Sequence, residues 1–366
     1  MARFLKRFHG SIRICSTGLP ASGSTLLKGT ILAVDSGWKG AAMLDVFNSD
    51  VGDEDCARLA VYLPQFPHLH TINFAGNNIT GDGVFALSCA LRSASSLTAL
   101  DLSRNTFGAS GAAYLAAQLR KSEALRALRV AGCGLPQASV AAICQGLPPN
   151  LEELDLSSNI LGDYAAGALA EALPCLLNLR ALFFSAVPEL RAAGPAPDQP
   201  PLTGGNDRMS HAGAAMLARG LMNCQHLHQL HLAHHKIGAP GAGLVFASLS
   251  APVQSLSDEG AAARRLPTIE HLDLSHCGLS CVPQKAWTQM ACLAALHSLQ
   301  LSGNALDTED LFSLARVLPA LTSLTSLDLR QVAMSEEGRW AIVSASSLPN
   351  LAGSVHCDGG MAESDT

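Results

Sequence analysis

The stretch LTALDLSRNTFGASGAAYLAAQL, from Leu97 to Leu119, decides the fold. Its first half alternates apolar side chains, so Leu100 and Leu102 would lie on the same side of a short strand. After Asn105, small and aliphatic residues follow at helical spacing from Gly111 onward. One strand, one Asn turn and one helix cannot bury their apolar faces alone. The stretch therefore needs copies of itself on both sides.

Copies of this stretch recur along most of the chain. They begin at Ala41, Leu69, Leu97, Leu125, Leu151, Leu179, Leu227, Ile269, Leu296 and Leu324. Most intervals are 26 to 28 residues, but Leu179 is followed after 48 residues and Leu227 after 42. The extra residues predict two insertions. The first, at 191–209, comes after a strand and before its helix, and the second, at 250–267, comes after a helix and before the next strand.

A fixed position after each predicted strand is usually Asn or Cys. It is occupied by Asn77, Asn105, Cys133, Asn159, Cys277 and Asn304. An Asn side chain there can bond backbone groups of the turn that stacking buries. Four copies depart from the pattern, with Ser49, Val187, His235 and Val332 at this position. We expect these four turns to be looser or differently bonded.

The pattern LxxLxLxxN/CxL, with a period near 28, resembles the leucine-rich repeat in its ribonuclease-inhibitor-like form. The resemblance covers residues 41–350 in nine to ten copies. It implies an α/β leucine-rich-repeat solenoid (horseshoe) with parallel strands on the concave face and helices on the convex face. Residues 1–40 would form a basic N-terminal arm and cap, with a capping strand in 28–40. Residues 351–366 would form a C-terminal cap and tail.

Composition and motifs narrow the function. Lys and Arg number 24 against 30 Asp and Glu, a net charge of −6, so we expect no nucleic-acid partner. No apolar run reaches the length of a membrane span. The chain has no GxxxxGK[ST], HExxH or GxSxG motif, so we predict neither catalysis nor a cofactor.

The cysteines and the first residues bear on location. Eleven cysteines without an apolar signal-peptide core predict reduced thiols and an intracellular protein. Residues 1–16 are basic, and their apolar side chains, Ile12 among them, could share one helical face, which is typical of a mitochondrial transit peptide. The alternative is a basic arm before the first repeat. We expect the cytoplasm, with mitochondria as the alternative.

Residues between the strand leucines would face the concave side. Their central positions read Asn73, Asp101, Arg129, Asp155, Phe183, His231, Asp273, Gln300 and Asp328. Because neighbouring strands lie about 4.8 Å apart, Arg129 would pair with Asp101 and Asp155. One interpretation is a solvated charge ladder that contributes little stability. The other is a polar stripe that recognises a partner.

We expect a protein partner to bind the concave face between Arg129 and Asp273, bordered by the two insertions. Phe183 is an aromatic residue on a polar strand face, and aromatic and Arg side chains are common binding anchors. The alternative is that the insertion at 191–209 covers Phe183. The predicted contact residues are Arg126, Arg129, Glu153, Asp155, Arg180, Phe183, His228, His231 and Asp273.

Histidines are concentrated in one part of the chain. Eight of the thirteen lie between positions 226 and 297. In register, His234 would lie beside His276, His231 would face Asp273, and His228, Glu270 and His297 would form a row. Such a cluster could bind a metal, sense pH or form a polar patch without a ligand. No ligand motif accompanies it, so we predict no metal.

The leading hypothesis is a non-catalytic intracellular scaffold that binds a protein through its concave face. The repeats also resemble those of the GTPase-activating protein for the nuclear-transport GTPase. That family has its catalytic arginine in an early insertion and usually has a long acidic tail. Here the repeats at 41–125 lack an insertion, and the tail has only Asp358, Glu363 and Asp365. A third hypothesis is a structural subunit of a large axonemal or organellar assembly.

Overall fold

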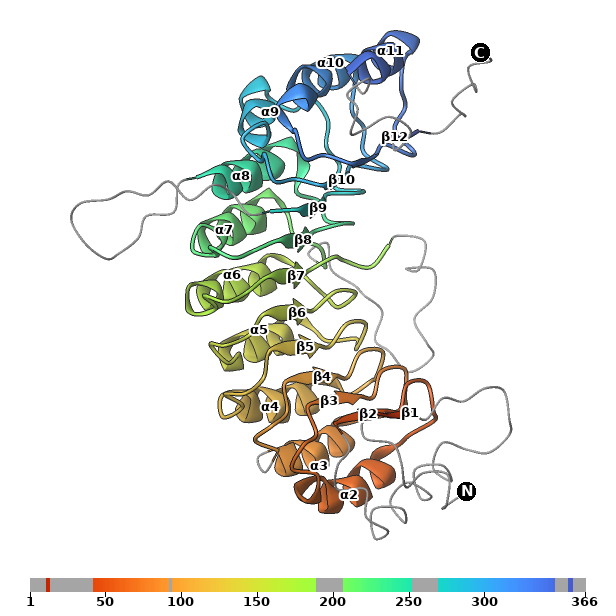
Figure 1. Cartoon of the computed structure of the whole chain (residues 1–366), viewed down its shortest axis with the longest axis vertical. Coiled ribbons are helices and arrows are strands. Elements are labelled where there is room, and N and C mark those ends of the chain that lie inside the picture. The colour runs from red at the N-terminus through yellow and green to blue at the C-terminus, as the bar shows by residue number, and fades with distance from the viewer. Residues whose placement is uncertain are drawn as a thin grey trace, which may run out of the picture. The chain divides into compact units, whose positions relative to one another are not determined.

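The computed structural model describes residues 11–13, 42–91, 94–188, 207–251, 269–345 and 355–357. The chain divides into two compact units, Met1–Ile160 and Leu161–Thr366, called unit 1 and unit 2 here. Both units repeat the predicted order of strand, turn and helix (Figure 1).

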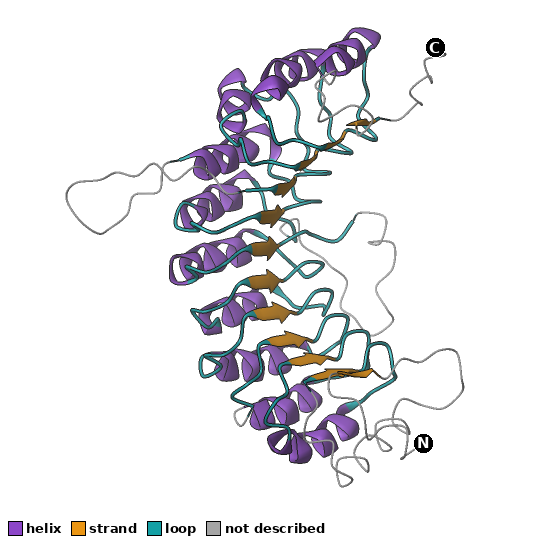
Figure 2. Cartoon of the chain, viewed as in Figure 1, coloured by secondary structure: helices purple, strands orange, loops and turns teal. Residues whose placement is uncertain are grey.

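Unit 1 contains parallel strands that each pair with the next strand along the chain. They are β1 (Ser11–Arg13), β2 (Met43–Asp45), β3 (Thr71–Asn73), β4 (Ala99–Asp101), β5 (Ala127–Arg129) and β6 (Glu153–Asp155). The helices between them are α2 (Asp53–Tyr62), α3 (Gly81–Leu91), α4 (Gly108–Leu119) and α5 (Gln137–Gly146), with a short 3-10 helix at Leu63–Gln65. Strands line one face of the unit and helices line the other (Figure 2).

Unit 2 has the same two layers. Its strands are β7 (Ala181–Phe183), β8 (Gln229–His231), β9 (His271–Asp273), β10 (Ser298–Gln300), β11 (Ser326–Asp328) and β12 (Val355–His356), again parallel and paired in chain order. Its helices are α6 (Asp163–Ala172), α7 (His211–Leu221), α8 (Gly238–Ser250), α9 (Gln284–Met290), α10 (Thr308–Val317) and α11 (Glu336–Ala345). Short 3-10 helices follow α6 at Leu173–Cys175 and α10 at Leu318–Ala320.

The core of each unit lies between the strands and the helices. The middle residue of each inner strand is buried, as Leu100, Leu128 and Leu154 show in unit 1, where they pair in register. Its two neighbours on the strand are half-buried on most strands because they face the other side. This confirms the predicted register, and it leaves one face of each strand layer to polar side chains.

The Asn position forms the predicted ladder of turn hydrogen bonds. Asn159 accepts the backbone N–H groups of Cys133 and Leu135 at 3.0 and 3.1 Å. Its amide donates to the carbonyls of Val130 and Leu156, both at 2.8 Å. Asn77, Asn105 and Asn304 make equivalent bonds in their own turns. Each Asn therefore links two successive repeats at a buried site.

The residue just before this position is left-handed in nine turns. These residues are Asn48, Gly76, Arg104, Gly132, Ser158, His234, His276, Gly303 and Gln331, with φ between 50° and 71°. A left-handed conformation is costly for a residue other than glycine. The ladder bonds on either side hold the turn closed, so side chains such as His234 are tolerated there.

Two of the four departures from the Asn position, Ser49 and His235, are bonded differently, as expected. Ser49 donates its hydroxyl to the carbonyl of Phe47 at 3.0 Å. His235 is fully buried and bonds two successive repeats through its ring nitrogens. Its side chain therefore makes two bonds to the preceding repeat, where Asn159 makes three.

The N-terminal prediction needs correction. Ser11–Arg13 forms β1, which pairs with Met43–Asp45, so Ile12 lies on a strand and not on a helical face. This strand, rather than one within 28–40, pairs with the strand of the first predicted repeat. The segment 28–40 itself lies outside the described residues.

The boundary of the first insertion also differs from the prediction. The described residues 207–209 belong to the turn of the next layer, because Leu161 donates its N–H to the carbonyl of Asp207 at 3.1 Å. Met209 is fully buried. Residues 207–209, the last three of the predicted insertion, therefore belong to the repeat itself. Most of both predicted insertions, 191–206 and 252–267, lies outside the described residues.

Candidate functional site

The strand face of each unit carries the predicted polar residues, and several of them hold their own turns. Asp101 and Asp155 accept the N–H of the residue two positions later, Ser103 and Ser157, each at 2.9 Å. Asn73, Asp273 and Asp328 do the same at 2.9 to 3.0 Å. Short carboxylates are suited to this turn bond. These central residues are thus part of the scaffold as well as of its surface.

Arg129 and His231 occupy the same central position, but their side chains do not accept the N–H of the residue two positions later. In their turns, a serine of the preceding repeat accepts the N–H instead. Ser103 Oγ bonds Ala131 N, and Ser185 Oγ bonds Ala233 N, each at 3.1 Å. The two turns are therefore closed without using Arg129 or His231.

The charges on the strand face of unit 1 form a close ion pair. Arg129 Nε and Nη2 donate to the two carboxylate oxygens of Glu153 at 2.6 and 2.8 Å. Asp101 and Asp155 lie opposite Arg129 in register, as expected, and their charges attract it. The close contact is made by Glu153 instead, because the two shorter carboxylates bond their own turns. Arg126 lies 3.8 Å from Glu152.

The surroundings of Arg129 and Asp155 shift the pKa values of both side chains. Burial lowers the pKa of Arg129, but its hydrogen bonds and charge attraction to Glu153 outweigh burial and raise that pKa above its ordinary value. Burial raises the pKa of Asp155, and its turn bond to Ser157 only partly offsets this effect. Arg129 therefore stays charged and fixed in place.

In unit 2 the strand face has an aromatic and imidazole stack at its centre. The rings of Phe183 and His231 lie 4.6 Å apart at 20°. His231 Nδ1 in turn lies 3.6 Å from Asp273 Oδ2, as the predicted register requires. Burial would raise the pKa of Asp273, but His231 and the Ser275 hydrogen bonds lower it overall. Sequence reasoning placed these residues together but missed the stacking.

The remaining predicted residues of unit 2 border this stack. Arg180 is exposed, and its carbonyl accepts the N–H of His228 at 2.7 Å. His228 Nε2 lies 4.0 Å from Glu270 Oε1. The rings of His234 and His276 are stacked at 4.5 Å and 9°. The predicted rows of histidines are therefore present.

The predicted contact residues fall on both units. Arg126, Arg129, Glu153 and Asp155 lie on unit 1, whereas Arg180, Phe183, His228, His231 and Asp273 lie on unit 2. They form two groups, each held together within its own unit. Whether the first insertion covers Phe183 stays a prediction, since 189–206 lies outside the described residues.

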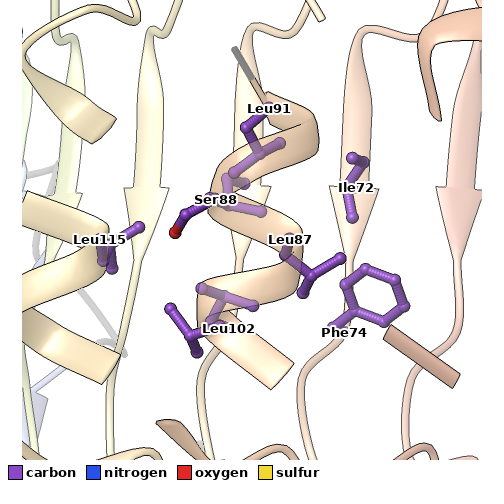
Figure 3. A pocket seen from close by; sticks show the side chains of 9 residues that line it. Ile72, Phe74, Leu87, Ser88, Leu91, Leu102 and Leu115 are labelled. Atoms are coloured by element: carbon purple, nitrogen blue, oxygen red, sulfur yellow. The ribbon is translucent and has the colours of Figure 1, made fainter. Parts of the chain in front are cut away.

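Other kinds of site are not evident in the part of the chain that the structure describes. There, no group of three or more His, Cys, Asp or Glu side chains is arranged to hold a metal ion. No described helix is long and apolar enough to cross a membrane. A small cavity of about 10 Å³ lies inside unit 1, lined by apolar side chains and Ser88 (Figure 3). It is too small for a ligand and belongs to the core.

A family model described as "Leucine Rich repeat" matches residues 67–88, 93–116, 148–170, 223–245 and 265–280. Tonsoku-like protein of Mus musculus is 32% identical over 271 residues, which are 71% of this chain and 16% of that protein. Leucine-rich repeat-containing protein 45 of Gallus gallus is 33% identical over 138 residues, 37% of this chain and 21% of that protein.

Ribonuclease inhibitor of Sus scrofa is 31% identical over 188 residues, covering 50% of this chain and 37% of the inhibitor. The aligned part thus spans about a fifth or less of the first two relatives and over a third of the inhibitor. Each matched segment contains one of the strands described above, and three of them, 67–88, 93–116 and 148–170, also contain an Asn turn and the start of a helix. The chain is a leucine-rich repeat protein of the ribonuclease-inhibitor-like class.

Proposed function

We propose that this protein is a non-catalytic scaffold that binds a protein partner through its strand faces. The observation that carries the proposal is the release of Arg129 and His231 from turn bonding by Ser103 and Ser185. Neighbouring carboxylates at the same position are used to close turns. Arg129 and His231 can therefore present their side chains to a partner without weakening the repeat.

Both centres are held in place before a partner arrives. The two-point bond to Glu153 fixes the Arg129 guanidinium, and stacking on His231 fixes the Phe183 ring. A side chain that is already ordered loses less conformational entropy on binding. Arginine and aromatic side chains are also the residues that most often dominate interface energy. These features support a contact centred on Arg129 in unit 1 and on Phe183 and His231 in unit 2.

The titrating groups support a role without catalysis. Burial raises the pKa of the thiols of Cys56, Cys133, Cys144 and Cys277 to about 12, which makes them poor nucleophiles. Both ring nitrogens of His235 are hydrogen-bonded to the backbone. These five strongly shifted groups are thus elements of the core.

An intracellular, reducing location is part of this proposal, with the cytoplasm preferred over mitochondria. Ten described cysteines are free thiols, and several are buried as small apolar side chains. The pairing of β1 with β2 gives Ser11–Arg13 a place in the fold, which favours retention of this segment over its removal. Microscopy of the chain tagged at its C-terminus would test the location.

The function is tested by capturing partners of the full-length chain from cells, followed by quantitative mass spectrometry. Two variants probe the strand faces, Arg129→Ala for unit 1 and the double substitution Phe183→Ala with His231→Ala for unit 2. Matched controls on the helix faces are Val61→Ala in unit 1 and Trp340→Ala in unit 2, which are 69% and 72% exposed.

We expect at least one strand-face variant to lose a partner by about tenfold or more, because hot-spot residues carry most of the binding energy. The helix-face controls should retain it. Circular dichroism must show that each variant stays folded. If only the helix-face variants lost the partner, the strand faces would not be the binding surface.

A further inference from the structure

Six histidines share the strand face of three neighbouring repeats in unit 2. The set, called the histidine face here, consists of His228, His231, His234, His271, His276 and His297. His271 lies on β9, paired with Gln229 and Ser298, and the others lie on β8 or flank β8, β9 and β10. Backbone bonds run from His228 to Arg180, from Glu270 to His228 and from His297 to Glu270, so these positions form one continuous row.

Each imidazole of the histidine face has a defined neighbourhood. His228 lies near Glu270, and His231 lies between Phe183 and Asp273. His297 follows Glu270 in the row, and the next residue of that row is Thr325. The ring of His234 stacks on the ring of His276. The His276 ring in turn lies over Gly303, and a Cβ atom added to Gly303 would come within 2.1 Å of it. His271 has uncharged Gln229 and Ser298 beside it in register.

The charge of the histidine face depends on protonation. With neutral imidazoles, Arg180, Glu270 and Asp273 give these rows a net charge of −1. Protonation of all six imidazoles would change it to +5. Two protons are enough to turn the net charge of −1 into +1. Imidazole is the side chain whose charge changes most readily near neutral pH.

We propose that the histidine face docks an acidic segment of a partner protein, and that docking draws protons onto the imidazoles. The proposal rests on the proposed function and names the chemistry of the partner. The stacked pair His234 and His276 shows the coupling most directly. Two protonated rings 4.5 Å apart repel each other, so a carboxylate placed over them favours the doubly charged state. By linkage, protons and the acidic partner then strengthen each other's binding.

A protein segment fits this surface better than a nucleic acid. Glu270 and Asp273 interrupt the rows of imidazoles, and an acidic segment can place single carboxylates between them. Nucleic-acid affinity depends mainly on Lys and Arg, and positions 227–235, 269–277 and 296–304 of these three repeats contain neither.

The test uses the full chain and a fluorescent polyglutamate peptide. Glutamate side chains are negatively charged at pH values above about 5, which includes both values used in the test. Anisotropy titrations at pH 7.5 and 6.0 should show binding about tenfold or more tighter at pH 6.0. Calorimetry in two buffers of different ionisation enthalpy should show net proton uptake on binding. Equal affinity at the two pH values, or no proton uptake, would overturn the proposal. So would tighter binding of a single-stranded oligonucleotide than of polyglutamate.

Two variants assign the effect to the histidine face. The chain with His228→Gln, His231→Gln and His234→Gln should lose most of the gain at pH 6.0. A control with His68→Gln, His211→Gln and His226→Gln removes three exposed histidines outside the face and should keep the gain. The single variant His234→Gln, which removes only one stacked ring, should take up fewer protons even if the triple variant fails to fold. An unchanged pH response in His234→Gln and in a folded triple variant would refute the assignment.

This outcome is separable from the proposed function. If strand-face variants lose the cellular partner while polyglutamate binding is independent of pH, only the present inference fails. If polyglutamate binding follows the histidines while strand-face variants keep every cellular partner, the proposed function fails instead.

Discussion

Met209 donates its backbone N–H to Nδ1 of His235 at 3.1 Å. A backbone N–H can only donate, so Nδ1 is the acceptor, and Nε2 carries the hydrogen that bonds the carbonyl of Phe184 at 2.6 Å. Asn159 makes the same two contacts with the repeat before it. It accepts the N–H of Leu135 and donates to the carbonyl of Val130. A neutral imidazole thus replaces the Asn amide in this repeat.

The first prediction is that His235 makes folding weaken in acid. Burial is the main cause that lowers the pKa of His235 from 6.5 to about 4. The unfolded chain therefore binds the proton more tightly, so stability is complete above pH 6.5 and declines as the pH falls toward 4. The loss over this range is about 3 kcal/mol at 1.4 kcal/mol per pH unit. Denaturant titrations of the full chain at several pH values measure it.

The matched variant is His235→Asn, which restores the residue found in other turns. Its side chain does not titrate, so the decline between pH 6.5 and 4 should be smaller by about the same 3 kcal/mol. Carboxylates shared by both chains would cancel in the comparison. Identical pH profiles for the two proteins would contradict the assigned role of His235.

The sequence predicted the repeat register correctly because burial of Leu100, Leu128 and Leu154 depends on a simple alternation. It could not identify the partner of Arg129. Side-chain reach and the turn bonds of Asp101 and Asp155 decide that pairing, and register alone contains neither. For the same reason, only the structure shows which central residues are free of turn bonding.

Strand β1 was missed for a different reason. Its copy of the pattern is short, lies 32 residues before the first residue of β2 and has no Asn turn that would mark it. The basic and apolar residues around Ile12 are equally compatible with a helix. Pairing with Met43–Asp45 is a long-range contact, which local periodicity does not report.

The second prediction concerns the Asn ladder. Asn159→Ala removes four hydrogen bonds of 2.8 to 3.1 Å and a longer one of 3.4 Å at a site that is 3% exposed, which leaves backbone groups of two repeats without partners. We expect a loss of about 3–5 kcal/mol, since each buried unpaired group costs about 1–3 kcal/mol. Urea denaturation followed by circular dichroism measures the loss.

Cys133→Ala serves as the comparison at the same position one repeat earlier. Cys133 uses its thiol to donate to the carbonyl of Leu102 at 3.3 Å. A thiol is a weak donor, so this substitution should cost about 1 kcal/mol. Equal costs for the two substitutions would show that packing, rather than the ladder bonds, makes this position important.

The third prediction concerns the buried hydroxyl of Ser88. Its Oγ has no hydrogen-bond partner and lies beside the small cavity of unit 1. Figure 3 shows Ser88 on its helix among Leu87, Leu91 and Leu115. Removing an unpaired buried hydroxyl should stabilise the fold, so Ser88→Ala is expected to gain about 1 kcal/mol. Ser248→Ala is the control, because Ser248 Oγ bonds the carbonyl of Val245 at 2.8 Å. A destabilised Ser88→Ala protein would mean that the hydroxyl has a partner in solution.

The last prediction compares two helical glycines whose replacement by alanine should have opposite effects. A Cβ atom on Gly146, at the end of α5, would lie 2.4 Å from the backbone oxygen of Ala116 on α4. Backbone cannot move aside cheaply, so Gly146→Ala should force the two helices apart and cost about 1–3 kcal/mol. On Gly167 of α6, the nearest atom to the new Cβ would be the sulfur of Met216 at 3.2 Å. That flexible side chain can shift by a few tenths of an ångström.

Gly167→Ala should therefore stabilise its helix by about 0.5–1 kcal/mol, because alanine restricts the unfolded chain and favours helix. Denaturant midpoints of the two variants and the parent protein provide the measurement. The sequence alone assigns both glycines the same helical cost, so the difference in sign depends on how closely the helices pack. If both substitutions raised the midpoint, α4 and α5 would be farther apart in solution than the distance from Gly146 to Ala116 requires.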